Sequence, residues 1–283
     1  MRRATVVASI IAVVALLWVG CRLRGEAGAP APRPPAPAEA TPAAPSAAAH
    51  PPAPQPGAGS RPGPTWAELR PGLAWRVASV AGGSAELTLL RVNPRRLSLQ
   101  VVDVRRTGAA RATVRELVEQ RHALAAVNGG FFDEHGEPMG LLIHQGKQTN
   151  PLRRADWGIF LLRGDRPQIR HTRQGVPSGA QEALQCGPRL VISGRVPQFK
   201  GDEDFRTAVG ITPDGQVLLA VTSRGLLSLE ALARALRDLG CRDALNLDGG
   251  ASSQMYLHAG EQTLEIPATY PVPSALVVEE RGK

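Results

Sequence analysis

Two polar side chains stand directly before paired glycines, a combination that can build a site for an anionic group. Asn128 precedes Gly129-Gly130, and Asp248 precedes Gly249-Gly250. Paired glycines let the backbone adopt positive φ and expose N–H groups, while a carboxylate can act as a base or a nucleophile. Asn-Gly and Asp-Gly are also strong turn signals, so either segment alone fits a simple turn. The presence of both favours a site.

Short apolar runs lead into both segments. Residues 124–127 and 244–247 are too short for core helices, and they suit buried strands that end at a turn signal. Asn128 and Asp248 would then lie at or just beyond the carboxyl ends of strands, where open α/β sheets collect ligands. The sequence therefore predicts a site at strand ends, next to two Gly-Gly loops.

A helix is predicted before each of these strands. Thr113 and Glu116 fit a capping box, with a hydroxyl at the N-cap and a carboxylate three residues later. Ser228 caps a second segment, in which apolar residues recur at helical spacing until Gly240. The chain thus twice runs helix, buried strand, polar residue and Gly-Gly. This loose echo, too imperfect for a repeat, suggests that the two Gly-Gly loops lie side by side.

The first 64 residues differ from the rest in composition. Residues 1–21 combine a positive start with an apolar run that ends at Cys21, as in an export signal. Trp18-Val19-Gly20-Cys21 resembles a lipoprotein lipobox, and an uncleaved membrane anchor remains the alternative. Residues 22–64 are rich in Pro and Ala and predict a disordered, extended linker. Both alternatives place the remainder, residues 65–283, outside the cytoplasm on a tether, in the periplasm or at the cell surface.

Charge and motifs exclude several classes of function. The net charge is +8, but residues 1–65 hold six arginines against two glutamates, so the later domain carries a surplus of only four. No zinc-finger spacing, RNA-binding aromatic signature or dense basic helix occurs, so we expect no nucleic-acid partner. Walker A, G-x-G-x-x-G and G-x-S-x-G motifs are missing, and we expect no cofactor. Asp133 to Glu137 has metal-type side chains, but the segment fits an exposed acidic turn better, so no metal site is predicted.

Two cysteines remain in the later domain, Cys186 and Cys241. In an oxidising compartment they could form a disulfide or stay free, and the sequence alone leaves both alternatives open. Cys186 as a nucleophile would need a positioned histidine, and none can be assigned.

Two further segments carry arginines at predicted strand ends. Arg189 follows a Gly-Pro turn, and Arg206-Thr207 begins a strand that leads to a Pro-Asp-Gly hairpin. A strand-end arginine is usually solvated, yet a guanidinium is the side chain best matched to a phosphate. Aromatic residues gather near these motifs, and one or two of them would suit a sugar platform.

The order of these motifs resembles that of the phosphodiester glycosidase family. The matching segments extend from about Leu87 to Glu279, and they are A-V-N-G-G-F-F-D at 126–133, P-M-G-L-L-I at 138–143, G-P-R-L-V at 187–191, R-T-A-V-G at 206–210, N-L-D-G-G-A-S-S at 246–253 and P-V-P-S-A-L-V-V at 271–278. Ala251 fills the place of a third small residue after the glycine pair. Cys186 stands where a small or hydroxyl residue is expected.

The resemblance implies a hydrolase that cuts a sugar-1-phosphodiester between the anomeric carbon and the phosphate, in the cell envelope. The catalytic residues implied are Asp248 as base or nucleophile, Asn128 and Asn246 as orienting groups, and Arg206 as the phosphate's counter-charge. The substrate-binding residues implied are Gly129, Gly130, Arg189, Thr207, Gly249, Gly250, Ser252 and Ser253. The glycine N–H groups would hold phosphate oxygens.

Two other functions compete with this reading. The same loops and arginines could belong to a non-catalytic module that binds a phosphorylated envelope glycan. A cysteine hydrolase using Cys186 is the third alternative, and it fails if that thiol is bridged to Cys241.

The predicted fold is mixed α/β or α+β, with a central mixed sheet, two clear helices and the site at one sheet edge. Strands are predicted at 85–90, 97–104, 124–127, 158–162, 190–192, 208–211, 217–222, 244–247 and 275–278.

Overall fold

The computed structural model describes residues 65–282. Within this range no helix is both long enough and apolar enough to cross a bilayer. The expected signal or anchor at 1–21 and the expected linker at 22–64 lie outside the described residues, so both remain predictions. The described part is dominated by strands, with two α-helices and several 3-10 turns, which agrees with the expectation of few helices.

A seven-stranded sheet has the order β1-β2-β3-β13-β12-β14-β11. Its strands are β1 (Ala67–Arg70), β2 (Leu73–Val80), β3 (Ala85–Val92), β13 (Val217–Arg224), β12 (Thr207–Ile211), β14 (Asp243–Asn246) and β11 (Arg189–Val191). The Pro213-Asp214-Gly215 turn joins β12 to β13, with Gly215 at a φ of 83° and its N–H donating to Thr212. The predicted hairpin is confirmed.

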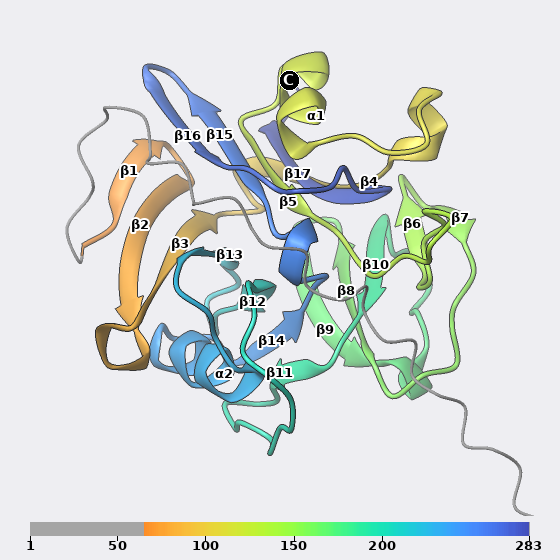
Figure 1. Cartoon of the computed structure of the whole chain (residues 1–283). Coiled ribbons are helices and arrows are strands. Elements are labelled where there is room, and N and C mark those ends of the chain that lie inside the picture. The colour runs from red at the N-terminus through yellow and green to blue at the C-terminus, as the bar shows by residue number, and fades with distance from the viewer. Residues whose placement is uncertain (1–64, 283) are drawn as a thin grey trace, which may run out of the picture. The chain divides into compact units, whose positions relative to one another are not determined.

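Two five-stranded sheets complete the β structure (Figure 1). One has the order β16-β15-β5-β17-β4, with β16 (Gln262–Ile266), β15 (Met255–Ala259), β5 (Ala125–Asn128), β17 (Ser274–Glu280) and β4 (Leu97–Asp103). The other has the order β7-β6-β10-β8-β9, with β7 (Lys147–Asn150), β6 (Leu142–His144), β10 (Glu182–Cys186), β8 (Gly158–Arg163) and β9 (Arg166–His171).

Every pairing between these strands is antiparallel. The expected central mixed sheet is therefore wrong, and three antiparallel sheets take its place. All nine predicted strands are present, with ends shifted by one or two residues. β5 and β14, which lead into the two Gly-Gly loops, belong to different sheets. Packing between sheets, rather than one shared sheet edge, must bring the loops together.

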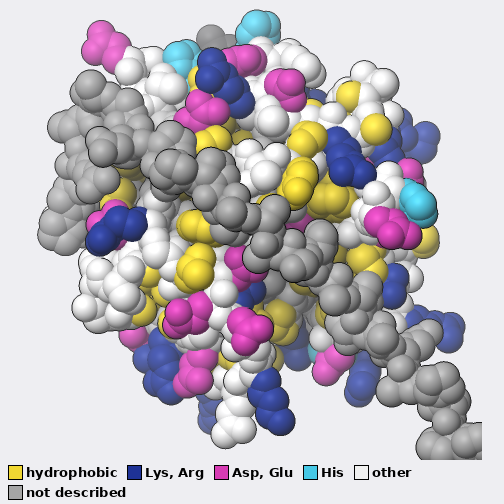
Figure 2. Space-filling view, in the orientation of Figure 1, with side chains coloured by type: hydrophobic (Ala, Val, Ile, Leu, Met, Phe, Trp, Pro, Cys, Tyr) yellow, Lys and Arg dark blue, Asp and Glu magenta, His cyan; other side chains and the backbone are white. Residues whose placement is uncertain are grey.

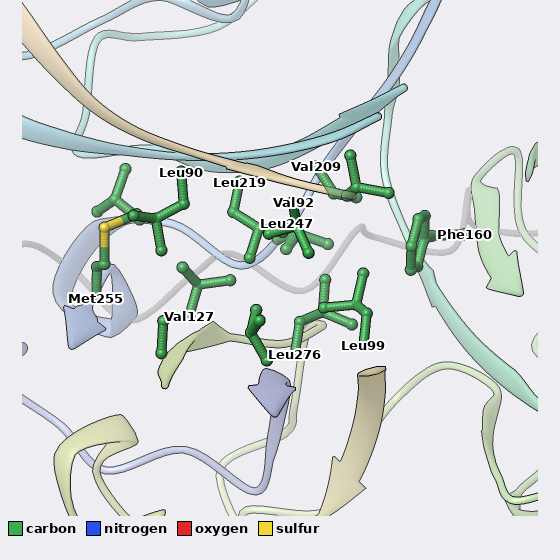
Figure 3. Close-up of a cluster of buried hydrophobic side chains, with 14 of the residues drawn as sticks. Leu90, Val92, Leu99, Val127, Phe160, Val209, Leu219, Leu247, Met255 and Leu276 are labelled. Atoms are coloured by element: carbon green, nitrogen blue, oxygen red, sulfur yellow. The ribbon is translucent and has the colours of Figure 1, made fainter. Parts of the chain in front are cut away.

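The main core fills the space between the seven-stranded sheet and the sheet that contains β5. In Figure 3, Leu90, Val209 and Leu219 reach into this core from one side, while Val127 and Leu276 reach in from the other. Phe160 of β8 adds a fully buried ring from the third sheet. Burial of this much apolar surface is the dominant favourable contribution to folding.

Each helix covers the outer face of one sheet. α1 (Val114–Arg121) packs on the sheet of β5, and α2 (Leu229–Asp238) packs on the seven-stranded sheet. The predicted capping box is present, since the Thr113 hydroxyl accepts from the N–H of Glu116 and the Glu116 carboxylate accepts from the N–H of Thr113. Ser228 caps α2 by accepting from the N–H of Ala231. Each cap anchors the helix that precedes a site-bearing strand.

Candidate active site

The two Gly-Gly loops meet at the seam between two sheets. Asn128 is the last residue of β5, and Asp248 lies two residues beyond the end of β14. The Asn128 side chain donates from Nδ2 to the main-chain oxygen of Asp248 at 2.8 Å. In return, the N–H of Asp248 donates to the main-chain oxygen of Gly129 at 3.0 Å. The loops are thus joined directly. The short blue turn near the centre of Figure 1, η4 (Gly250–Ser252), continues the second loop.

Asn128 is fully buried, and both the nitrogen and the oxygen of its side-chain amide form hydrogen bonds. Its Oδ1 accepts from the Thr207 hydroxyl at 2.8 Å and from the N–H of Gln254 at 3.1 Å. Both Asn128 and Thr207 have 0% exposed surface. Asn128 therefore fixes the main chain at Asp248, and Thr207 fixes Asn128. The expected contact of Thr207 with a substrate is not offered by this arrangement.

Asp248 has the most displaced carboxylate pKa of the described residues. Burial raises the pKa of Asp248 to about 7, and the negative charge of Asp204 adds to the rise. The Ser252 side chain and the N–H of Gly249 donate to the carboxylate and partly oppose this shift; the Gly249 bond to Oδ1 measures 3.1 Å. A carboxyl group that titrates near neutral pH can exchange a proton during catalysis.

Asp204 is a member of the site that the sequence did not predict. Its Oδ2 lies next to Gly250, where an added Cβ would come within 3.1 Å of it. Its Oδ1 accepts from the N–H of Phe205 at 2.8 Å, and main-chain bonds to Leu227 hold the segment on both sides. The charge of Asp204 acts on Asp248. A pair of interacting carboxylates is the usual equipment of a glycosidase.

Arg206 lies alongside the second loop, but much of it is already engaged. Its Nε donates to the main-chain oxygen of Leu227 at 2.9 Å, and Nη2 donates to that of Asp202 at 2.5 Å. The side chain also borders Gly249, where Cδ and Nη1 both lie 3.9 Å from the position of an added Cβ. Burial lowers the pKa of Arg206, while Asp204 and Asp202 oppose that change. Arg206 is thus held in place by two main-chain oxygens beside the second loop.

The four loop glycines serve close packing rather than anion binding. Their N–H groups donate within the chain: Gly129 to Ser274 O, Gly130 to Ser274 Oγ, Gly249 to Asp248 Oδ1 and Gly250 to Phe205 O. The expectation that these N–H groups hold phosphate oxygens is therefore not supported. A Cβ at Gly129 would approach Ser274 Oγ to 2.4 Å, and one at Gly249 would approach Phe205 O to 2.9 Å. A larger residue at Gly129 would push against Ser274, and one at Gly249 would push against Phe205.

Three other predicted residues lie around Asp248. Asn246 is buried and donates from Nδ2 to the main-chain oxygens of Gly187 and Leu247, at 3.0 and 2.7 Å. Its Oδ1 and the Ser253 hydroxyl are buried without a hydrogen-bond partner among the described residues. Ser252 bonds to the Asp248 carboxylate. Asn246 thus braces the strand end rather than the substrate, and the Ser253 hydroxyl remains available as a donor.

Arg189 does not join Arg206. Its stem lies against Gly158 of β8, where an added Cβ would approach Cγ to 2.7 Å. Its charge acts on the exposed Asp156, whereas no effect of Arg189 on Asp248 is resolved. The structure therefore places the two predicted phosphate arginines in separate environments.

Cys186 lies inside the site as a buried thiol. It has 0% exposed surface, and both Cys186 and Cys241 are free. Burial, together with the charge of Asp248, raises the pKa of Cys186 well above its usual range. A nucleophilic cysteine needs the opposite shift. The structure therefore argues against a cysteine hydrolase, and the disulfide that the sequence left open is not formed.

Aromatic rings line one side of the site. Phe131 follows the first glycine pair and meets Trp157 edge to face, with ring centroids 5.1 Å apart and an interplanar angle of 66°. The Trp157 side chain also packs on Gly187, next to Cys186. Both rings keep some exposure, as a sugar platform requires.

The acidic segment after Phe132 is a turn, as predicted. Asp133 Oδ1 accepts from the N–H groups of His135 and Glu137, at 3.0 and 2.8 Å. Within residues 65–282, no group of three or more His, Cys, Asp or Glu side chains is placed to hold a metal ion.

Solved structures share this fold. The catalytic domain of zebrafish N-acetylglucosamine-1-phosphodiester alpha-N-acetylglucosaminidase, auto-inhibited by its pro-peptide, has a TM-score of 0.59 at 19% identity, covering 74% of this chain and 82% of that one. A putative exported protein from Burkholderia pseudomallei K96243 has a TM-score of 0.51 at 14% identity, covering 73% and 74% of the two chains. The fold is thus one found in a hydrolytic domain.

Sequence comparison makes the assignment specific. The phosphodiester glycosidase profile matches residues 121–279, more than half of the chain. The chain belongs to the phosphodiester glycosidase family, a family of hydrolases. It is also 28% identical over 190 residues to YigE, an uncharacterized protein of Escherichia coli K12, covering 62% of this chain and 73% of the relative. The resemblance noted from the motifs is confirmed.

Proposed function

We propose that this chain hydrolyses a sugar-1-phosphodiester in the cell envelope, with Asp248 as the catalytic carboxylate. One observation carries the proposal: Asp248 stands where the two Gly-Gly loops meet, and its pKa is raised to about 7. Activity on a sugar-1-phosphodiester is also named for the zebrafish enzyme that shares the fold.

Asp248 acts as a general base in the proposed reaction. Ionised Asp248 removes a proton from a water molecule, whose oxygen bonds to the anomeric carbon while the bond from that carbon to the phosphate oxygen breaks. The sugar leaves as the free hemiacetal, and the other product is a phosphate monoester. Because the phosphate leaves readily as an anion, little general-acid help is needed, in contrast to ordinary glycosides.

Neighbouring residues support Asp248 in different ways. Nη1 of Arg206 lies beside Gly249, and the Ser253 hydroxyl has no hydrogen-bond partner among the described residues, so we assign these two donors to phosphate oxygens. Asn128 and Asn246 act as positioning residues, since both are buried. Burial raises the pKa of Asp248, and the negative charge of Asp204 adds to the rise. Phe131 and Trp157 would flank the sugar.

The location in the envelope is proposed from the start of the sequence. Residues 1–21 read as an export signal or anchor, and residues 22–64 read as a linker. The Burkholderia neighbour is described as a putative exported protein. Fractionation of cells that express the full chain, with and without Cys21→Ser, tests this. Loss of membrane association in that variant supports a lipoprotein, whereas retention supports an uncleaved anchor.

Kinetics of Asp248→Asn test the catalytic proposal. On a nucleotide sugar or another sugar-1-phosphodiester, we expect kcat to fall by at least about a hundredfold, because removal of a general base costs this much. Asp165→Asn, on the turn between β8 and β9, is the matched control and should leave kcat unchanged. Near-normal turnover by Asp248→Asn would contradict the proposed role.

A second experiment distinguishes an enzyme from a non-catalytic binding module. A binding module would hold the phosphodiester without releasing reducing sugar. Calorimetric binding of a substrate panel, combined with an assay for reducing sugar, distinguishes the two functions. Tight binding with no release by the wild-type protein would favour the binding module.

A further inference from the structure

Three arginines near Trp157 and its neighbour Asp156 form no ion pair with a carboxylate. Elsewhere many arginines are paired, as Arg115, Arg121 and Arg234 are. Among residues 65–282, no ion pair is formed by Arg153, Arg173 or Arg189, which together with Trp157 make up what we name the Trp157 basic surface. Unpaired positive charges that lie close together repel one another unless an anion joins them.

The Trp157 basic surface is built on the start of β8 and the end of β9. The guanidinium of Arg153 lies 5.7 Å from the centre of the Trp157 ring. The stem of Arg189 lies against Gly158, and the charges of Arg173 and Arg189 both act on Asp156, the residue before Trp157. Figure 2 shows Lys and Arg side chains along the rim on the side of these strands.

The carboxylate of Asp156 lies among these positive charges but does not balance them. Asp156 is exposed, and its Oδ1 lies 2.6 Å from Nε2 of His171. This bond to His171, together with the charges of Arg173 and Arg189, lowers the pKa of Asp156. The positive charge therefore exceeds the negative charge at this place.

The Trp157 basic surface adjoins the proposed active site. Trp157 contacts Phe131 of the first Gly-Gly loop edge to face and also packs on Gly187. The residue after Gly187 accepts from the N–H of Asn246 at 3.0 Å, so the same short segment supports the strand that leads to Asp248. A ligand that extends past Phe131 from Asp248 would meet these arginines next.

The chemistry of the surface favours phosphate groups. A guanidinium offers planar paired donors that match phosphate oxygens, and Trp157 supplies a face for a sugar or a polyol. A single sugar-1-phosphodiester carries one negative charge, which Arg206 alone would balance. Nucleic acid usually requires several aromatic platforms in succession, whereas Trp157 stands here with only Phe131 against its edge.

We propose that the Trp157 basic surface is a binding subsite for additional phosphates of the substrate, which is therefore a glycan with repeated phosphodiester links. The inference rests on the proposed function for the bond that is cut, but binding at the subsite can be measured without turnover. The residues nearest Asp248 select the sugar, and the arginines select the charged chain attached to it.

Paired substitutions test the subsite. Arg153→Gln combined with Arg173→Gln should raise KM for a sugar-bearing oligomer of glycerol phosphate by about tenfold, because two phosphate contacts are lost. Turnover of a monomeric sugar-1-phosphodiester should not change. Arg163→Gln combined with Arg166→Gln is the matched control, since both are exposed arginines at the other end of the same hairpin. An equal effect of both pairs would overturn the proposal.

Binding measured in an Asp248→Asn background separates the subsite from the catalytic proposal. The full chain should bind the glycerol phosphate oligomer in a manner weakened by salt, and the Arg153 and Arg173 substitutions should reduce that binding by about tenfold. If they do so while the wild-type protein hydrolyses no sugar-1-phosphodiester, the catalytic proposal fails and the subsite stands. Equal affinity for single-stranded DNA, or for phosphatidylglycerol vesicles, would overturn the assignment to a glycan.

Discussion

The side-chain amide of Asn128 donates to the main-chain oxygen of Asp248 at 2.8 Å, although the two residues are 120 positions apart. This hydrogen bond joins the end of a strand in one sheet to a loop that follows a strand in another. Since the Asp248 N–H also bonds to Gly129 O, the main chain of Asp248 is fixed on both sides. The carboxylate that we propose as catalytic is thus held by a buried neighbour.

Replacement of Asn128 should damage both stability and catalysis. Asn128→Leu leaves Asp248 O, the Thr207 hydroxyl and the N–H of Gln254 without their partner. We expect the free energy of unfolding to fall by about 2–4 kcal/mol, because buried polar groups would lose their hydrogen bonds. Urea denaturation measures this change.

A control accompanies the Asn128 substitution. Asn93→Leu removes an amide whose side chain accepts one bond, from the N–H of Arg95, and it should cost much less. An Asn128→Leu protein as stable as the Asn93→Leu protein would contradict the bracing role of Asn128.

Asp248 should make the protein less stable as the pH rises. Its pKa is about 7 in the folded state, against about 3.9 in an unfolded chain. The folded state therefore holds a proton more tightly, so this contribution is complete below about pH 4 and is lost as the pH passes 7. Asp248→Asn stays neutral, so it should be more stable than wild type at pH 8.5 and equal to it near pH 4.

Thermal unfolding at several pH values measures this difference. Asp165→Asn controls for the removal of a surface carboxylate. A wild-type protein that is more stable than Asp248→Asn at pH 8.5 would show that the carboxylate is not destabilised by burial.

Asp204 should contribute to the pH at which the enzyme becomes active. With Asp248 as the base, kcat/KM should rise as the pH increases through about 7, the pKa of Asp248. The negative charge of Asp204 contributes to that value. Asp204→Asn should therefore move the acid limb of the profile to lower pH, while its side-chain oxygen still accepts from the N–H of Phe205.

The control for this substitution is Asp202→Asn, which removes a charge that acts on Arg206. The pH–rate profiles of both variants test whether Asp204 acts on the acid limb. An unshifted acid limb in Asp204→Asn would rule out its action through Asp248.

Thiol reagents should not inactivate the native enzyme. Cys186 and Cys241 are buried, and burial raises the pKa of both thiols, that of Cys241 to about 12. Iodoacetamide should label neither thiol in the folded protein and both in urea, as peptide mass spectrometry can show. Cys186→Ser should retain activity. Rapid inactivation that tracks labelling of Cys186 would revive the cysteine mechanism.

Much of the strand content could be predicted because the signal is local. The continuous apolar runs before Asn128 and Asp248 indicate buried strands whatever they pair with, and those strands are present. β10 was missed because Glu182 and Gln185 interrupt its apolar pattern. Their buried side chains are satisfied by the N–H groups of Val101 and Leu141, partners that a local pattern does not reveal.

The direction of the strands and the full set of site residues were harder to predict from the sequence. β5 pairs with β15 and β17, which lie more than 120 residues later, and an apolar run does not encode the direction of its neighbours. Asp204 was missed because G-D-E-D-F reads as a solvated acidic loop. Gly250, whose missing side chain leaves room beside Asp204, belongs to a motif more than 40 residues away. The glycine pairs correctly indicated the two loops. Their N–H groups were predicted to bind phosphate oxygens, but in the structure they donate hydrogen bonds within the chain.

The seam between the sheets makes the geometry of the proposed site depend on packing in the core. Val127 and Leu247, the residues next to Asn128 and Asp248, are both buried in the shared apolar interior. A change in how these two side chains fit together would alter the spacing of the loops without touching any substrate. Substitutions of these two aliphatic core residues are therefore expected to affect the proposed site as well as the stability of the fold.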